Sequence, residues 1–157
     1  MFLTKEELKS AIYQYRIDEI TEEDDDIVLI AIEAAIQEVQ SYFTPNFKKE
    51  WGDGRFTYDI EEIFNAEGNN RNPLILKHTK TIAVWNVIEL ANVDMIYEQV
   101  KERYDRAVEW LKEFAKGDVS IAGLPTKPVE MLDEDGNPID IEPFRFGSRK
   151  KFNHDIN

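Results

Sequence analysis

Histidine and cysteine, which often supply nucleophiles, bases and metal ligands, are scarce in this chain. The sequence contains no cysteine, which excludes disulfides, thiolate metal sites and a cysteine nucleophile within it. Its two histidines are His78, which has no histidine or carboxylate four residues on, and His154 near the end. Since neither is spaced as a metal-binding pair or a catalytic dyad, we expect both to have structural roles.

Two runs of carboxylates raise the question of a cation site. The DEDGN run at residues 133–137 lacks the ligands over about twelve positions and the closing glutamate of a calcium loop, so we interpret it as a turn. Asp24, Asp25 and Asp26 are adjacent, and adjacent side chains point in different directions, so we interpret them as the start of a helix. We predict no catalytic residue, no metal ligand and no cofactor, and a carboxylate-dependent metalloenzyme is our least favoured hypothesis.

The most informative local feature is FRFGSRKKF, at residues 144–152. An extended strand of this type can insert its aromatic rings into pockets of a partner while its cations meet an acidic surface. Contact with DNA phosphates is a second interpretation, and a frayed terminus is a third. The candidate partner-binding residues are Phe144, Arg145, Phe146, Gly147, Ser148, Arg149, Lys150, Lys151 and Phe152.

The charge balance argues against general binding to nucleic acid or to anionic membranes. The formal net charge is −13, which repels both. The first thirty residues carry nine acidic and three basic side chains, whereas residues 144–152 carry four basic and no acidic ones. No stretch approaches the roughly 18 apolar residues of a membrane span, and MFLTKEEL lacks the pattern of a secretion signal. We therefore expect an acidic body that ends in a local basic patch, with no membrane partner.

Capping signals predict two helices in the first third of the chain. Thr4 and Glu7 form a capping box for a short helix that we expect to end near Tyr15. Thr21 is the predicted cap of a second helix, which runs to about Tyr42. Its buried face follows helical spacing. That face comprises Val28, Ile32, Ala35, Val39 and Tyr42, and is widened by Ile30, Ala31, Ala34 and Ile36.

A third predicted helix begins at Asn72-Pro73, a cap followed by proline at the first helical position, and ends near Ala91. Its second half, IAVWNVIELA, is apolar nearly all round, so it is buried either centrally in the domain or by a neighbouring subunit. The connection before it, residues 44–72, is expected to fold its aromatics onto the core, with a short helical turn at Ile60–Phe64. These aromatics are Trp51, Phe56, Tyr58 and Phe64.

A fourth helix is predicted to start at Asn92 or Asp94 and to end at Gly117. Residues 118–157 have too little apolar sequence for a core of their own and are predicted to form an extended arm. Within the arm, two short apolar runs flank DEDGNP and predict a short β-hairpin. The predicted fold class is therefore all-α, a small bundle of four main helices over residues 1–117 with a long C-terminal arm.

Three segments of the chain resemble a known family. MFLTKEEL, RNPLILKHTKTIAVWNV and KERYDRAVEWLKEFAKGDVSIAGLP look like the Mu-like phage head–tail connector (neck) proteins. The ending FRFGSRKKFNHDIN resembles the arginine–aromatic–glycine–serine ending of members from phages and prophages of Bacteroides-type hosts. The resemblance spans most of residues 1–125 and the final dozen, its most specific parts are YDRAVEWLKEFAKG and RFGS, and it does not extend to residues 44–70.

The resemblance implies a small helical adaptor in a ring beneath the portal vertex of a tailed virus, where it extends the DNA channel toward the tail. It implies a homo-oligomeric ring, dodecameric to match the portal, with the portal protein and the next neck or tail protein as partners. DNA would pass through the ring without sequence-specific binding. The implied location is the virion neck, after synthesis in the host cytoplasm, and no catalytic residues are carried over. A monomeric protein-binding adaptor or regulatory module of a prophage is the alternative.

Overall fold

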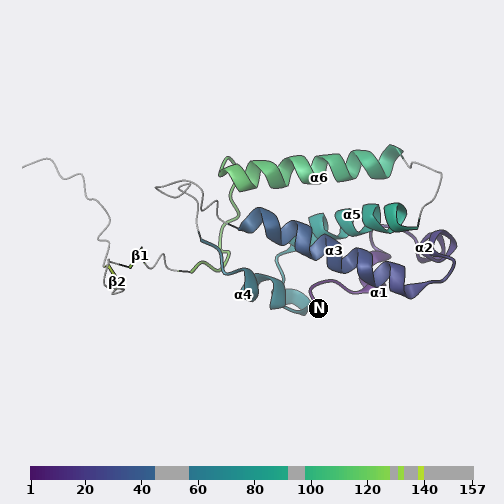
Figure 1. Cartoon of the computed structure of the whole chain (residues 1–157), viewed down its shortest axis with the longest axis horizontal. Helices are drawn as coiled ribbons and strands as arrows, with labels where there is room; N and C mark the ends of the chain where they lie inside the picture. Colours follow the sequence, from purple (N-terminus) through teal and green to yellow (C-terminus); the bar gives the residue numbers. More distant parts are fainter. Residues whose placement is uncertain (45–56, 92–97, 128–130, 133–137, 140–157) are drawn as a thin grey trace, which may run out of the picture. The chain divides into compact units, whose positions relative to one another are not determined.

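The structure, a computed structural model, describes residues 1–44, 57–91, 98–127, 131–132 and 138–139. It is mostly helical, and the predicted all-α fold class is confirmed (Figure 1). The chain divides into two compact units, Met1–Lys127 and Pro128–Asn157. The helices described in the first unit are α1 (Lys5–Leu8), α2 (Gln14–Thr21), α3 (Asp25–Phe43), α4 (Ile60–Asn65), α5 (Pro73–Leu90) and α6 (Glu98–Lys116).

The N-terminal region contains two helices where the sequence analysis predicted one. The predicted capping box of α1 is present. However, α1 ends at Leu8 and not near Tyr15. The Ser10 hydroxyl donates to the Glu7 carbonyl at 2.8 Å, and such a side-chain bond competes with continuation of the helix. A separate helix, α2, then begins at Gln14.

The predicted cap of the next helix was three residues too early. Thr21 is the last residue of α2, where its hydroxyl donates to a carbonyl one turn earlier. Glu22 and Glu23 then adopt left-handed φ angles of 53° and 64°, which end that helix. The Asp24 side chain caps α3 by accepting a hydrogen bond from the Asp26 N–H at 2.9 Å. The acidic run therefore starts a helix, as predicted, with aspartate in place of threonine as the cap.

The core forms where α3, α5 and α6 pack together. α3 packs against each of the other five helices, and α5 packs against α2, α3 and α6 within one chain. Figure 1 shows α6 lying along α3 and α5. The buried face predicted for α3 holds at its centre, but Ile30 and Ala34, which we expected to widen it, are exposed. The buried residues of α3 are Val28, Ala31, Ile32, Ala35, Val39 and Phe43.

Aromatic rings join the connection before α5 to the ends of α3 and α6. The Phe43 ring centroid lies 5.6 Å from that of Tyr58, 5.6 Å from that of Phe64 and 4.6 Å from that of Phe114. Tyr58 and Phe64 thus fold back onto the core as predicted, and the predicted helical turn is present as α4. The other two aromatics of that prediction, Trp51 and Phe56, lie outside the described residues.

The segment after α6 belongs to the helical unit. Gly117 ends α6 with a φ of 87°, a conformation that favours glycine, as predicted. The chain then returns to the connection before α4, where the Lys127 N–H donates to the Thr57 carbonyl at 2.7 Å. The compact unit therefore includes residues 118–127, which the sequence analysis assigned to the arm.

The second unit contains a short hairpin. β1 (Met131–Leu132) and β2 (Pro138–Ile139) pair in antiparallel register, with Met131 opposite Ile139 and Leu132 opposite Pro138. The hairpin predicted around DEDGNP is therefore present in the backbone pairing.

Candidate partner-binding site

The residues that we predicted to bind a partner, Phe144 to Phe152, lie outside the described residues. Their role stays a prediction. His154 and residues 133–137 also lie outside. The surfaces available for a structural argument therefore belong to the helical unit, Met1–Lys127.

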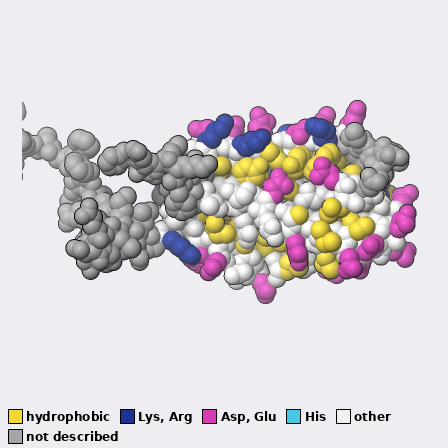
Figure 2. Space-filling model, viewed as in Figure 1, with side chains coloured by type: hydrophobic (Ala, Val, Ile, Leu, Met, Phe, Trp, Pro, Cys, Tyr) yellow, Lys and Arg dark blue, Asp and Glu magenta, His cyan; other side chains and the backbone are white. Residues whose placement is uncertain are grey.

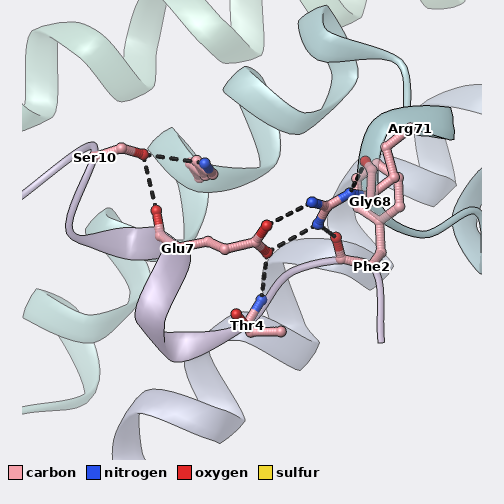
Figure 3. Close-up of polar contacts among 7 residues, drawn as sticks. Phe2, Thr4, Glu7, Ser10, Gly68 and Arg71 are labelled. Carbon is pink, nitrogen blue, oxygen red and sulfur yellow. Dashed lines mark hydrogen bonds and ion pairs between the residues drawn. The ribbon is translucent and has the colours of Figure 1, made fainter.

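An ion pair fixes the N-terminal segment against the start of α5; we call it the N-terminal clamp (Figure 3). Arg71 Nη2 donates to Glu7 Oε1 at 2.5 Å, and Arg71 Nη1 donates to Glu7 Oε2 at 2.8 Å. The same guanidinium donates to the Phe2 carbonyl at 2.7 Å and to the Gly68 carbonyl at 3.0 Å. These hydrogen bonds from Arg71 are the main reason why the pKa of Glu7 falls to about 2. The clamp thus joins three segments through one side chain.

His78 is a packing residue of α5. It is buried, and its ring stacks on Trp110 with centroids 4.7 Å apart and an angle of 12° between the planes. Burial, with a smaller contribution from Lys77, lowers the pKa of His78 to about 4. Its Nε2 has no hydrogen-bond partner among the described residues. A neutral, inward-facing imidazole fits the structural role that we predicted for it.

The aspartates at the start of α3 form local contacts. Asp24 serves as the helix cap, and Asp25 accepts a hydrogen bond from Lys5, which also lies 3.8 Å from Asp18. Among the residues that the structure describes, no group of three histidine, aspartate or glutamate side chains is placed to hold a metal ion. The described helices also include none that is long and apolar enough to cross a membrane.

A groove with cationic walls lies between the first half of α5 and the middle of α6; we call it the basic groove. It encloses about 690 Å³, and the segment after α1 completes its wall. Its apolar lining includes Leu76, Ala107 and Trp110, and no carboxylate side chain lines it among the described residues. Its four cationic residues are Lys77 and Lys80 from α5, and Arg103 and Arg106 from α6.

The cations of the basic groove are not neutralised by direct ion pairs within the described part of the chain. Lys80 donates to the Ser10 hydroxyl at 3.1 Å, and Arg106 donates to a backbone carbonyl at 3.3 Å. Lys77 and Arg103 form no hydrogen bond or ion pair with described residues. The groove is therefore a local reversal of charge on a chain of net charge −13, and such a concave cluster attracts anions.

Sequence reasoning missed the basic groove. The available signal was the spacing of three residues within each cationic pair, which places both members of a pair on one helical face. What the sequence does not contain is the information that these two faces meet across one hollow.

On the side of α6 that faces α3, the half-buried charged group is a carboxylate, in contrast to the cations of the basic groove. The Tyr104 hydroxyl donates to Glu38 Oε1 at 3.2 Å, and the Tyr104 ring stacks on Trp85 with centroids 5.2 Å apart. Burial raises the pKa of Glu38, and burial together with the charge of Glu38 raises the pKa of Tyr104 to about 12. This contact is half-buried and closed by α3, so it fastens helices together and offers little to a ligand.

A few large apolar or aromatic side chains are also exposed. Ile30 is 55% exposed and Leu90 is 48% exposed. Tyr13 and Tyr15 stack on each other at 5.7 Å between centroids. Figure 2 shows hydrophobic and acidic side chains next to one another on the viewed face of the helical unit. Scattered apolar residues of this kind are normal for a protein surface and do not define a binding site.

No family model, curated protein or solved structure matches this chain. The structure defines a small all-α helical unit over Met1–Lys127.

Proposed function

We propose that the chain is a structural head–tail connector of a tailed phage. In this role it forms a dodecameric ring under the portal vertex, extends the DNA channel toward the tail, and contacts the portal protein and the next neck or tail protein. Its place would be the neck of the virion. The proposal starts from the resemblance of its N-terminal, central and α6 segments to the Mu-like connector proteins.

The observation that carries the proposal is that these three segments build one unit. Glu7 of the first segment binds Arg71 of the second, and His78 of the second stacks on Trp110 of the third. The resemblance therefore covers residues that join the N-terminal segment, α5 and α6 to one another. A ring subunit needs such a fixed body because its neighbours must meet the same surfaces at every position.

Docking to a portal provides the test. The full-length chain is mixed with the portal protein of the same phage, and complexes are analysed by gel filtration and electron microscopy. We expect rings of the chain on the portal. A chain truncated before Phe144 should keep its helical circular dichroism and melting temperature but lose docking, because it lacks the predicted partner-binding residues.

A matched control keeps the length and composition of the tail and changes only the sequence in which its residues follow one another. A scrambled sequence of residues 144–157 preserves charge and composition, so docking by this variant would mean that charge alone is sufficient. A full-length chain that stays monomeric and unbound with portal present would contradict the proposal. That result would favour the alternative, a monomeric protein-binding adaptor or regulatory module of a prophage.

A further inference from the structure

We propose that the basic groove receives the acidic segment 130–142 of a second copy of the chain. The inference rests on the proposed function, because it names the lateral contact between neighbouring copies in the ring. It concerns a surface and a segment that the predicted tail, residues 144–152, does not include.

The groove is lined by both apolar and cationic side chains. Trp110, Leu76 and Ala107 contribute apolar lining, and α5 and α6 contribute two cations each. Its volume of about 690 Å³ is in the range of sites that hold several side chains or a small ligand. Lys77 and Arg103 form no bond with described residues, so an incoming carboxylate would not have to displace an existing partner there.

The segment 130–142, EMLDEDGNPIDIE, has the complementary composition. It carries six acidic residues and no basic one, the reverse of the groove. Its acidic residues are interspersed with apolar ones, and its backbone pairs as a hairpin at β1 and β2. In the sequence, acidic residues directly flank the apolar ones, so one short segment can bring carboxylates to the cations of the groove and apolar side chains to its apolar lining. The apolar members are Met131, Leu132, Ile139 and Ile141.

Charge argues against other occupants. The basic tail, residues 144–152, would be repelled by four cations in the groove. The net charge of −13 opposes the approach of any polyanion, a nucleic acid included, whereas segment 130–142 adds apolar side chains that the apolar lining of the groove can accept. A second copy fits because a contact between two different surfaces of identical chains can close a ring.

A charge swap tests the contact in the full-length chain. The groove variant carries Arg103→Glu and Arg106→Glu, and the segment variant carries Asp133→Lys and Asp135→Lys. Self-association is measured by analytical ultracentrifugation at low salt. Each variant should weaken association by about tenfold or more, since two attractions become repulsions. The chain with all four substitutions should regain most of the affinity.

A control pair on the same helix isolates the effect of position. Lys112→Glu with Lys116→Glu makes the same change in net charge on exposed residues of α6 that do not line the groove. We expect self-association close to wild type from this pair, and unchanged circular dichroism from every variant. Equal weakening by the control and the groove variant would overturn the proposal, as would a failure of the fourfold variant to recover.

Cross-linking identifies the occupant. Unlabelled and ¹⁵N-labelled chains are mixed and treated with a carbodiimide, which joins lysines to carboxylates in contact. We expect mixed-isotope links from Lys77 or Lys80 to residues 130–142. Links within one chain only, or no link to this segment, would overturn the proposal. The two proposals can fail separately. If the cross-links and the charge swap give negative results, docking on the portal can still succeed. If the charge swap behaves as expected but the chain does not dock on the portal, only the connector role is refuted.

Discussion

Replacing Glu7 by glutamine removes the charge of the N-terminal clamp but keeps the size of the side chain. In the folded chain the pKa of Glu7 is about 2, against an ordinary value of 4.5. That difference corresponds to at most about 3 kcal/mol of stabilisation at neutral pH. The Glu7 side chain is 28% exposed, so water screens part of the attraction, and we expect Glu7→Gln to cost about 2 kcal/mol.

The pH dependence of stability separates the effect of the Glu7 charge from the effect of its side-chain size. Because the folded pKa lies below the unfolded one, the stabilisation is present above pH 4.5 and is lost as the pH falls toward 2. From pH 7 to about pH 3.5, Glu7 alone should account for about 1.4 kcal/mol of the stability that the wild type loses. Glu7→Gln should be less sensitive to acid by that amount. Urea unfolding followed by circular dichroism at both pH values gives the two free energies.

Glu6→Gln is the matched control, since Glu6 is the exposed neighbour in the same helix and forms no hydrogen bond among the described residues. It should change the free energy of unfolding by less than about 0.5 kcal/mol. If Glu7→Gln costs the same at pH 7 and pH 3.5, then the negative charge is not what stabilises the clamp. If it costs no more than Glu6→Gln, the clamp does not hold the N-terminal segment at all.

Three further substitutions probe the core, the buried histidine and the left-handed turn. Phe43→Ala should lower the free energy of unfolding by about 3–5 kcal/mol, measured in urea, because its ring is buried among three others; Phe43→Leu should cost less. His78 has its pKa lowered to about 4 by burial, so its stabilising contribution is present above pH 6.5 and lost as the pH falls toward 4. Between pH 7 and 5 the wild type should lose about 2 kcal/mol more than His78→Phe, and equal losses would mean that the imidazole is hydrated. Glu22→Gly should stabilise the chain by about 0.5 kcal/mol and so raise its melting temperature slightly, because the backbone φ of Glu22 is 53° and glycine adopts this conformation without strain. The control Glu19→Gly lies inside α2 and should lower the melting temperature.

Local signals predicted the parts of the fold that depend on a few neighbouring residues. The capping box of α1, the Asn72-Pro73 start of α5 and the glycine after α6 all hold, because each satisfies backbone groups within a few residues. The break between α1 and α2 was not predictable in the same way. It depends on Ser10, and the next break, between α2 and α3, depends on left-handed glutamates; neither residue type normally marks a helix end.

The candidate sites also differ in how far the sequence alone predicts them. The composition of the tail, residues 144–152, is visible in the sequence, and its structure lies outside the described residues. The basic groove, by contrast, depends on how α5 and α6 pack, so Lys80 and Arg103 line the same groove only in the folded chain. Sequence patterns within one helix contain no information about which face of another helix lies opposite.

The position of α5 bears on where the proposed ring would form its lateral contacts. Its sequence is apolar nearly all round, which left open whether a neighbouring subunit covers it. In the structure α2, α3 and α6 of the same chain cover it, so α5 does not need a neighbour to bury its apolar residues. Leu29 and Ile30 of α3 remain exposed, and two such side chains alone bury less area than a stable interface needs. A cationic surface would favour attraction between copies of an acidic chain, and the basic groove between α5 and α6 is a surface of that kind within the described residues.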